Sequence, residues 1–238
     1  MKNYFKNLKI LKDGNAYLKN MEHDACGVGL IASTEGKKSR KIVEYGINAL
    51  KAVFHRGAVD ADGKTGDGAG IHLEIPSDFF SEKIEITGHS HDGSEICVGM
   101  IFLPRNNYEA QENARTLVES ELTKSNFNIY GWRQVPVNPK VLGEKANLTR
   151  PEITQVLFKH NNKNLNGKDL ERKLYESRRK IEKEAIKNAI DGFYICSLSS
   201  KSIIYKGMFL AESISEFYID LKDERFISRY AIFHQRFS

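Results

Sequence analysis

The sequence predicts an α+β fold in which layers of sheet and helix pack on one another. Short apolar segments have the length and composition of strands. These segments lie at 26–33, 71–75, 96–103, 127–135 and 152–159. Two longer segments, 106–125 and 168–189, repeat apolar residues at helical spacing. Several strands have no polar face, which favours sheets that are covered on both sides.

The first 70 residues contain four predicted segments. Residues 1–25 are polar and show no clear period, so we expect a leader or arm. The strand at 26–33 is followed by 39–54, whose apolar residues have mostly helical spacing. A loop rich in glycine and aspartate, 55–70, then leads into the strand at 71–75.

The second half of the chain continues the alternation of helix and strand. In 168–189 the predicted inner side consists of Leu170, Leu174, Ile181, Ala185 and Ala189. Segments 193–200 and 202–209 are predicted to pair as a hairpin. Residues 230–233 are apolar on both faces, which places them inside a covered sheet. Because the chain ends five residues later, we expect this strand to lie on an open edge.

Composition excludes several classes of function. The chain has 238 residues, of which 40% are hydrophobic and 28% charged, as in soluble globular proteins. No apolar run approaches the ~18 residues of a membrane span, and no signal peptide is evident, so we expect a cytoplasmic protein without a membrane partner. The net charge of +5 comes largely from 159–187, where Lys and Arg alternate with Glu. That mixture is typical of a solvated helix, so we expect no nucleic-acid partner.

The three cysteines do not form a metal-binding or disulfide pattern. No CxxC pair is present, so we expect no metal site in this chain. Cys97 and Cys196 lie within apolar strands and are predicted to be core thiols. Cys26 differs because it begins a strand and is followed by Gly27 and Gly29, which allow close approach of another group.

Two interpretations of Cys26 follow from its position. It is either a core thiol at a strand end or a nucleophile. If residues 1–25 are removed, Cys26 gains a free α-amino group with a pKa of roughly 7.7–8.0. That amine could take the thiol proton, so one residue would supply both nucleophile and base.

Three segments resemble the class II glutamine amidotransferase domain of glutamate synthases, a family of N-terminal nucleophile hydrolases. They are EHDACGVGLIAS at 22–33, HRGAVDADGKTGDGAGIHLEIPSDFF at 55–80 and YAIFHQRFS at 230–238. The resemblance implies a layered αββα sandwich, incomplete here, with 1–25 as propeptide and 26–238 as the first part of the domain. It also implies hydrolysis of the side-chain amide of L-glutamine within glutamate biosynthesis and nitrogen assimilation.

The resemblance assigns roles to individual residues. Cys26 would be the catalytic nucleophile, and Arg236 would bind the α-carboxylate of glutamine. Arg56 and Gly57 match the His-Arg-Gly turn beside the active centre, although a purely structural turn is the alternative. The resemblance implies no cofactor in this segment, but it implies FMN and an iron–sulfur cluster in the full-length parent oxidoreductase, whose synthase domains would be partners.

The sequence also departs from the family pattern. An Asn-Gly pair that supplies the oxyanion hole is expected beyond the HQRFS segment and does not occur there. We therefore expect the chain alone to fold poorly and to lack glutaminase activity. Two alternatives remain open at this point: an inactive truncated fragment, or an N-terminal nucleophile hydrolase that acts on another amide.

Overall fold

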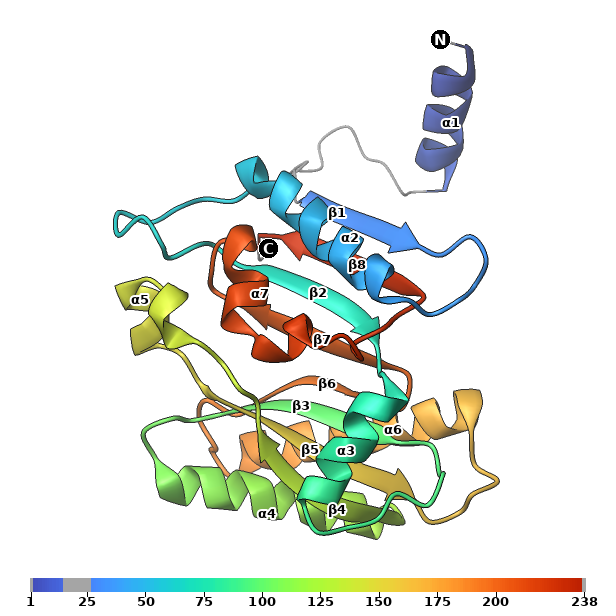
Figure 1. The fold of residues 1–238 in the computed structure, drawn as a ribbon, viewed down its shortest axis with the longest axis vertical. Helices are drawn as coiled ribbons and strands as arrows, with labels where there is room; N and C mark the ends of the chain where they lie inside the picture. Colours follow the sequence, from blue (N-terminus) through green and yellow to red (C-terminus); the bar gives the residue numbers. More distant parts are fainter. Residues whose placement is uncertain (1, 15–26, 237–238) are drawn as a thin grey trace.

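The computed structural model describes residues 2–14 and 27–236, whose strands form two antiparallel sheets (Figure 1). The first sheet contains, in spatial order, β1 (Gly27–Ala32), β8 (Tyr230–Gln235), β2 (Ala69–Glu74) and β7 (Ser202–Gly207). The second sheet contains β4 (Phe127–Gln134), β5 (Glu152–His160), β3 (Cys97–Leu103) and β6 (Tyr194–Ser199).

Helices pack on both sheets. Helix α2 (Arg40–Ala52) lies on the first sheet, while α4 (Tyr108–Lys124) and α6 (Gly167–Lys187) lie together on the second (Figure 1). The remaining helices are α1 (Lys2–Asp13), α3 (Ser77–Ile86), α5 (Glu144–Leu148) and α7 (Ile214–Phe217). Single 3-10 turns lie at Phe54–Arg56, Pro139–Val141, Ala211–Ser213 and Ile219–Lys222.

Two hydrophobic clusters hold these layers together. One fills the space between the second sheet and helices α4 and α6, with Ile101, Leu122 and Leu174 fully buried. The other joins α2, the first sheet and the opposite face of the second sheet, for example through Leu50 and Met100. The predicted layered α+β fold is therefore confirmed. Four of the five residues predicted for the inner side of 168–189 are buried in α6, whereas Ala189 lies beyond the end of the helix and is exposed.

The predicted hairpin at 193–209 is wrong, because β6 and β7 belong to different sheets. The turn between them is fixed by Glu171 on α6. Its carboxylate accepts hydrogen bonds from the Ser199 hydroxyl at 2.9 Å and the Ser200 backbone N–H at 2.8 Å. The chain therefore crosses from the second sheet to the first at this turn. Within the N-terminal segment, Lys2–Asp13 form helix α1.

The expected open edge at residues 230–233 is also wrong. Strand β8 lies between β1 and β2, and Phe233 has Gly29 as its partner on one side and Ile71 on the other. Earlier parts of the chain thus supply both neighbours of this strand. By contrast, the expectation that both sheets are covered on both faces holds for β3 and β5 but not for β1. On β1, the Val28 residue is 68% exposed and Leu30 is 61% exposed.

Candidate active site

Three strand ends lie side by side at one edge of the first sheet, the edge formed by the ends of strands rather than by an outer strand. Gly27 at the start of β1 is the register partner of Gln235 at the end of β8, and Gln235 is also paired with Ala69 at the start of β2. The segment 53–68 arrives at this edge before it enters β2. Antiparallel pairing therefore gathers segments that are far apart in the sequence.

Four residues were predicted for the site. Cys26 lies outside the described residues, but Gly27, the residue bonded to it, opens β1. Arg56 ends a 3-10 turn, and its side chain lies against Gly27, since a Cβ atom on Gly27 would be 3.3 Å from the Cβ and Cγ atoms of Arg56. Arg56 is thus a direct neighbour of the start of β1.

Because Gly57 has no side chain, the side chains of Gln235 and Asp67 occupy the space beside it. A Cβ atom at this position would lie only 2.1 Å from the Gln235 amide nitrogen Nε2 and 3.1 Å from Asp67 Oδ1. A larger residue would therefore have to displace Gln235, which is fully buried. The requirement for glycine in the His-Arg-Gly turn has this steric cause.

Arg236 follows β8 and reaches the same edge. Its backbone has φ of +84°, in the left-handed region that non-glycine residues rarely adopt. The Arg236 N–H donates a 2.7 Å hydrogen bond to the carbonyl of Gly68, which stabilises this conformation. Its guanidinium Nε lies 3.6 Å from Asp67 Oδ2, and the side chain is 43% exposed. Asp67 thus holds the Nε side of the guanidinium, while the Arg236 side chain stays accessible to solvent.

Two residues at this edge had no predicted role. Asp67 Oδ1 and Gln235 Oε1 are buried and find no hydrogen-bond partner among the described residues. An unsatisfied buried acceptor typically costs about 1–3 kcal/mol, so functional sites are where such groups are expected. Both residues lie in the segments quoted above, TGDGAG and HQRFS. Their place in these motifs was the signal available in the sequence.

The loop that carries Asp67 is tied down at several points. The Asp62 carboxylate accepts hydrogen bonds from the Thr65 hydroxyl at 2.5 Å and from its backbone N–H at 2.7 Å. These bonds, with the hydroxyl first, hold the pKa of Asp62 well below its ordinary value. Asp60 pairs with Lys145 of α5 at 2.7 Å. The loop is therefore fixed to α5 before it reaches Asp67.

The two described thiols lie outside this edge of the first sheet. Cys97 and Cys196 are both buried, as predicted. Burial raises the pKa of Cys97 well above its ordinary value and that of Cys196 to about 12. Both are therefore protonated at neutral pH and are poor nucleophiles.

Within residues 2–14 and 27–236, no three His, Cys, Asp or Glu side chains gather as metal ligands would. None of the helices in these two ranges is long and apolar enough to cross a membrane.

Two antiparallel sheets covered by helices form a layered fold of the N-terminal nucleophile hydrolase type. The family model described as "Glutamine amidotransferases class-II" matches residues 26–238, and the chain belongs to this family.

Glutamate synthases are among its relatives. The chain is 55% identical to the "Glutamate synthase [NADPH] large chain" of Azospirillum brasilense over 98% of its own length and 15% of that protein. It is 39% identical to "Ferredoxin-dependent glutamate synthase 2" of Synechocystis over 91% of its length and 14% of that protein. The chain thus spans about one seventh of these relatives.

Proposed function

We propose that this chain supplies the nucleophile, Cys26, of a glutamine amidotransferase domain that hydrolyses the side-chain amide of glutamine once residues 1–25 have been removed. The main supporting observation is the meeting of Arg56, Gly57 and Arg236 at the edge of the sheet where β1 begins. The family match, which starts at residue 26, supports the same boundary between leader and domain.

The proposed reaction needs no histidine. The free α-amino group of Cys26 takes the thiol proton, and the thiolate attacks the amide carbon of glutamine. The resulting tetrahedral intermediate collapses when the amine returns that proton to the leaving nitrogen, and ammonia departs. Water then attacks the thioester, which releases glutamate and restores the thiol. The sum is glutamine and water converted to glutamate and ammonia.

Arg236 supplies recognition of the substrate in this proposal. Its planar guanidinium can bind a carboxylate with two parallel hydrogen bonds. A free α-carboxylate distinguishes glutamine from a general amide, so an accessible arginine at this edge favours an amidotransferase over a hydrolase of other amides. The Asp67 contact leaves other donors of the guanidinium available.

The larger context is part of the same proposal. The relatives are glutamate synthases, so we propose that the ammonia serves glutamate synthesis by further domains that carry FMN and an iron–sulfur cluster. Arg56 and Gly57 would shape the active centre, and the protein would act in the cytoplasm.

Covalent labelling tests the nucleophile. The processed protein is treated with the glutamine analogue 6-diazo-5-oxo-norleucine and then analysed by peptide mapping. We expect the label on Cys26, because Cys97 and Cys196 are buried and protonated. Cys26→Ala should abolish labelling, whereas Cys196→Ala, the matched control, should not change it. Label found mainly on Cys97 or Cys196 would refute the proposal.

A further inference from the structure

A cavity of about 200 Å³ lies next to the first sheet. It opens beside Gly207 at the end of β7, and Gly207 is separated from Gln235 by strand β2. The cavity and the candidate site are therefore two distinct places at one end of the sheet.

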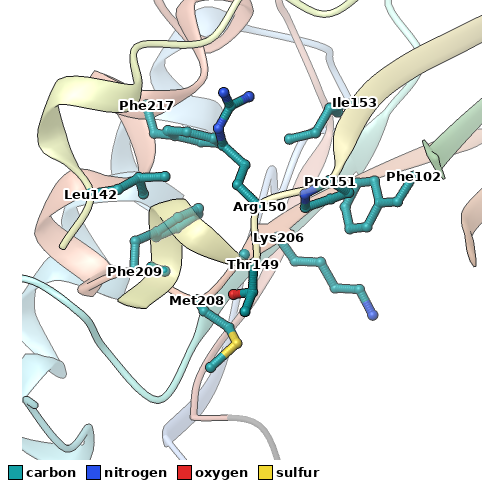
Figure 2. A pocket seen from close by; sticks show the side chains of 12 residues that line it. Phe102, Leu142, Thr149, Arg150, Pro151, Ile153, Lys206, Met208, Phe209 and Phe217 are labelled. Atoms are coloured by element: carbon teal, nitrogen blue, oxygen red, sulfur yellow. The ribbon is translucent and has the colours of Figure 1, made fainter. Parts of the chain in front are cut away.

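The wall of this cavity is mostly apolar (Figure 2). It is formed by Phe102, Leu142, Ala146, Ile153, Phe209 and Phe217. An apolar cavity of ~150 Å³ is large enough to hold benzene. The cavity here therefore has room for one ring with a short chain, but not for a drug-sized molecule.

One cation on the wall, Arg150, forms no salt bridge with any residue that the structure describes. Figure 2 shows the Arg150 side chain running between Phe217 and Ile153. Within the part of the chain that the structure describes, the Arg150 guanidinium donates one long hydrogen bond, 3.4 Å, from Nε to Asn147 Oδ1. Burial lowers the pKa of Arg150, the neighbouring Arg105 lowers it further, and Glu152 acts in the opposite direction. Glu152 itself accepts a 2.6 Å hydrogen bond from Gln134.

The second cation on the wall is already engaged. Lys206 Nζ donates a 2.6 Å hydrogen bond to the Tyr194 hydroxyl and lies 4.4 Å from the centre of the Tyr194 ring. Lys206 therefore contributes its aliphatic stem to the cavity, whereas Arg150 contributes a charge that a ligand could neutralise.

We propose that this cavity binds a compact apolar molecule that carries a single carboxylate, with the apolar body among the three phenylalanines and the carboxylate on Arg150. The fork of a guanidinium matches a carboxylate, and pairing would offset the cost of a partly buried cation. This proposal does not depend on glutamine hydrolysis, because the cavity shares no residue with the candidate active site.

Two probes that differ in charge test the proposal. The full 238-residue protein is titrated with 3-phenylpropanoate and with the neutral, nearly isosteric 3-phenylpropanamide, and binding is followed by calorimetry. We expect saturable binding of the anion and at least about tenfold weaker binding of the amide, as for a charge-assisted hydrogen bond. The methyl resonance of Met208, which lines the cavity, should shift on binding.

Variants then localise the effect. Arg150→Gln should remove the preference for the anion, so that the two probes bind equally. Arg172→Gln, which changes an exposed arginine on α6, should leave both affinities unchanged. Circular dichroism confirms that each variant is folded. The proposal is overturned if the anion shows no saturable binding, if the probes bind alike, if Arg150→Gln keeps the preference, or if the Met208 resonance does not move.

Discussion

Arg236 is held in place by its neighbours rather than by regular strand geometry. Its left-handed backbone is stabilised by the hydrogen bond to Gly68, and its side chain by Asp67. A residue in such a sparsely populated region typically costs about 1–3 kcal/mol and persists where its surroundings enforce it. The backbone of Arg236 thus brings the guanidinium beside the Asp67 carboxylate.

Substitution of Arg236 tests its proposed role in binding the substrate. In the active form of the protein, Arg236→Ala should raise the KM for glutamine roughly tenfold to a hundredfold, because a charge-assisted contact contributes about 1.5–3 kcal/mol. Arg236→Lys should recover only part of this loss, since lysine lacks the fork. Steady-state kinetics measures both variants. An unchanged KM in Arg236→Ala would remove the residue from the site.

Asp67 is expected to act through Arg236 rather than on the substrate. Asp67→Asn keeps the shape but removes the charge that lies 3.6 Å from Arg236 Nε. Because both side chains are partly exposed, the pair should contribute only about 0.5–1 kcal/mol, and KM should rise about threefold with kcat unchanged.

A double variant separates this positioning role from a direct one. In the Arg236→Ala background, Asp67→Asn should have no further effect on KM, because its partner is already gone. An additional loss of the same size in that background would show that Asp67 contacts the substrate itself.

At the scale of elements, α2 depends on a close approach to the first sheet. Gly46 faces Ala231 of β8, and a Cβ atom at position 46 would lie 2.4 Å from the Ala231 Cβ. Gly46→Ala should therefore lower the free energy of unfolding by about 1 kcal/mol. This value is the overpacking cost of about 1–3 kcal/mol reduced by the helix propensity gained, roughly 1 kcal/mol. Urea denaturation measures it.

Lys41→Ala is the matched control on the same helix. Lys41 is exposed, so alanine at this position brings a small gain in helix propensity without a clash. We expect this variant to keep or slightly raise stability. If Gly46→Ala were as stable as Lys41→Ala, the helix would have room to move away from the sheet, and the tight approach would not matter for stability.

The spacing of apolar residues in the sequence predicted those elements that bury one continuous face. Helices α4 and α6 were predicted because each has one apolar stripe, and α6 buries that stripe against the second sheet. Helix α3 was missed because it is short and its Phe79 and Phe80 are adjacent rather than spaced along a stripe. The strands β6 and β7 were identified, but local pattern carries no information on which sheet each one joins.

For a similar reason, the sequence alone predicted only some of the residues of the candidate site. Arg56, Gly57 and Arg236 were named through motifs. Asp67 and Gln235 lie in the same motifs, but the motifs do not show the contacts that these two residues make across the sheet. Gln235 meets Gly57 because β8 pairs with both β1 and β2. Such pairing between distant segments is set by the whole fold, and no local propensity encodes it.

At the scale of the molecule, a buried polar network connects the two sheets. Arg133 on β4 makes two hydrogen bonds, 2.8 and 2.9 Å, to Asp220 and a third to Gln155 on β5. The Tyr205 hydroxyl on β7 donates to Asp220 at 3.0 Å and accepts from Gln155 at 3.3 Å. Because β7 belongs to the first sheet and β4 and β5 to the second, we expect the sheets to unfold together.

Asp220→Asn tests this coupling. The change leaves the Arg133 charge without its partner at a site where the two side chains are 13% and 3% exposed. Loss of one member of a buried ion pair typically costs about 3–5 kcal/mol, so the urea midpoint should fall strongly. Fluorescence of Trp132, the single tryptophan and part of the second sheet, follows the transition. Hydrogen exchange of β2 amides follows the first sheet.

A network that couples the sheets should show itself in both probes. We expect β2 amides to exchange faster in Asp220→Asn, although β2 does not contain the substituted residue. The double variant Arg133→Met, Asp220→Asn should lose less stability than the sum of the losses in the two single variants. Asp191→Asn, which changes an exposed aspartate, is the control and should leave both probes unaltered. Unchanged exchange in β2, with a lower midpoint from Trp132 alone, would mean that the sheets unfold independently.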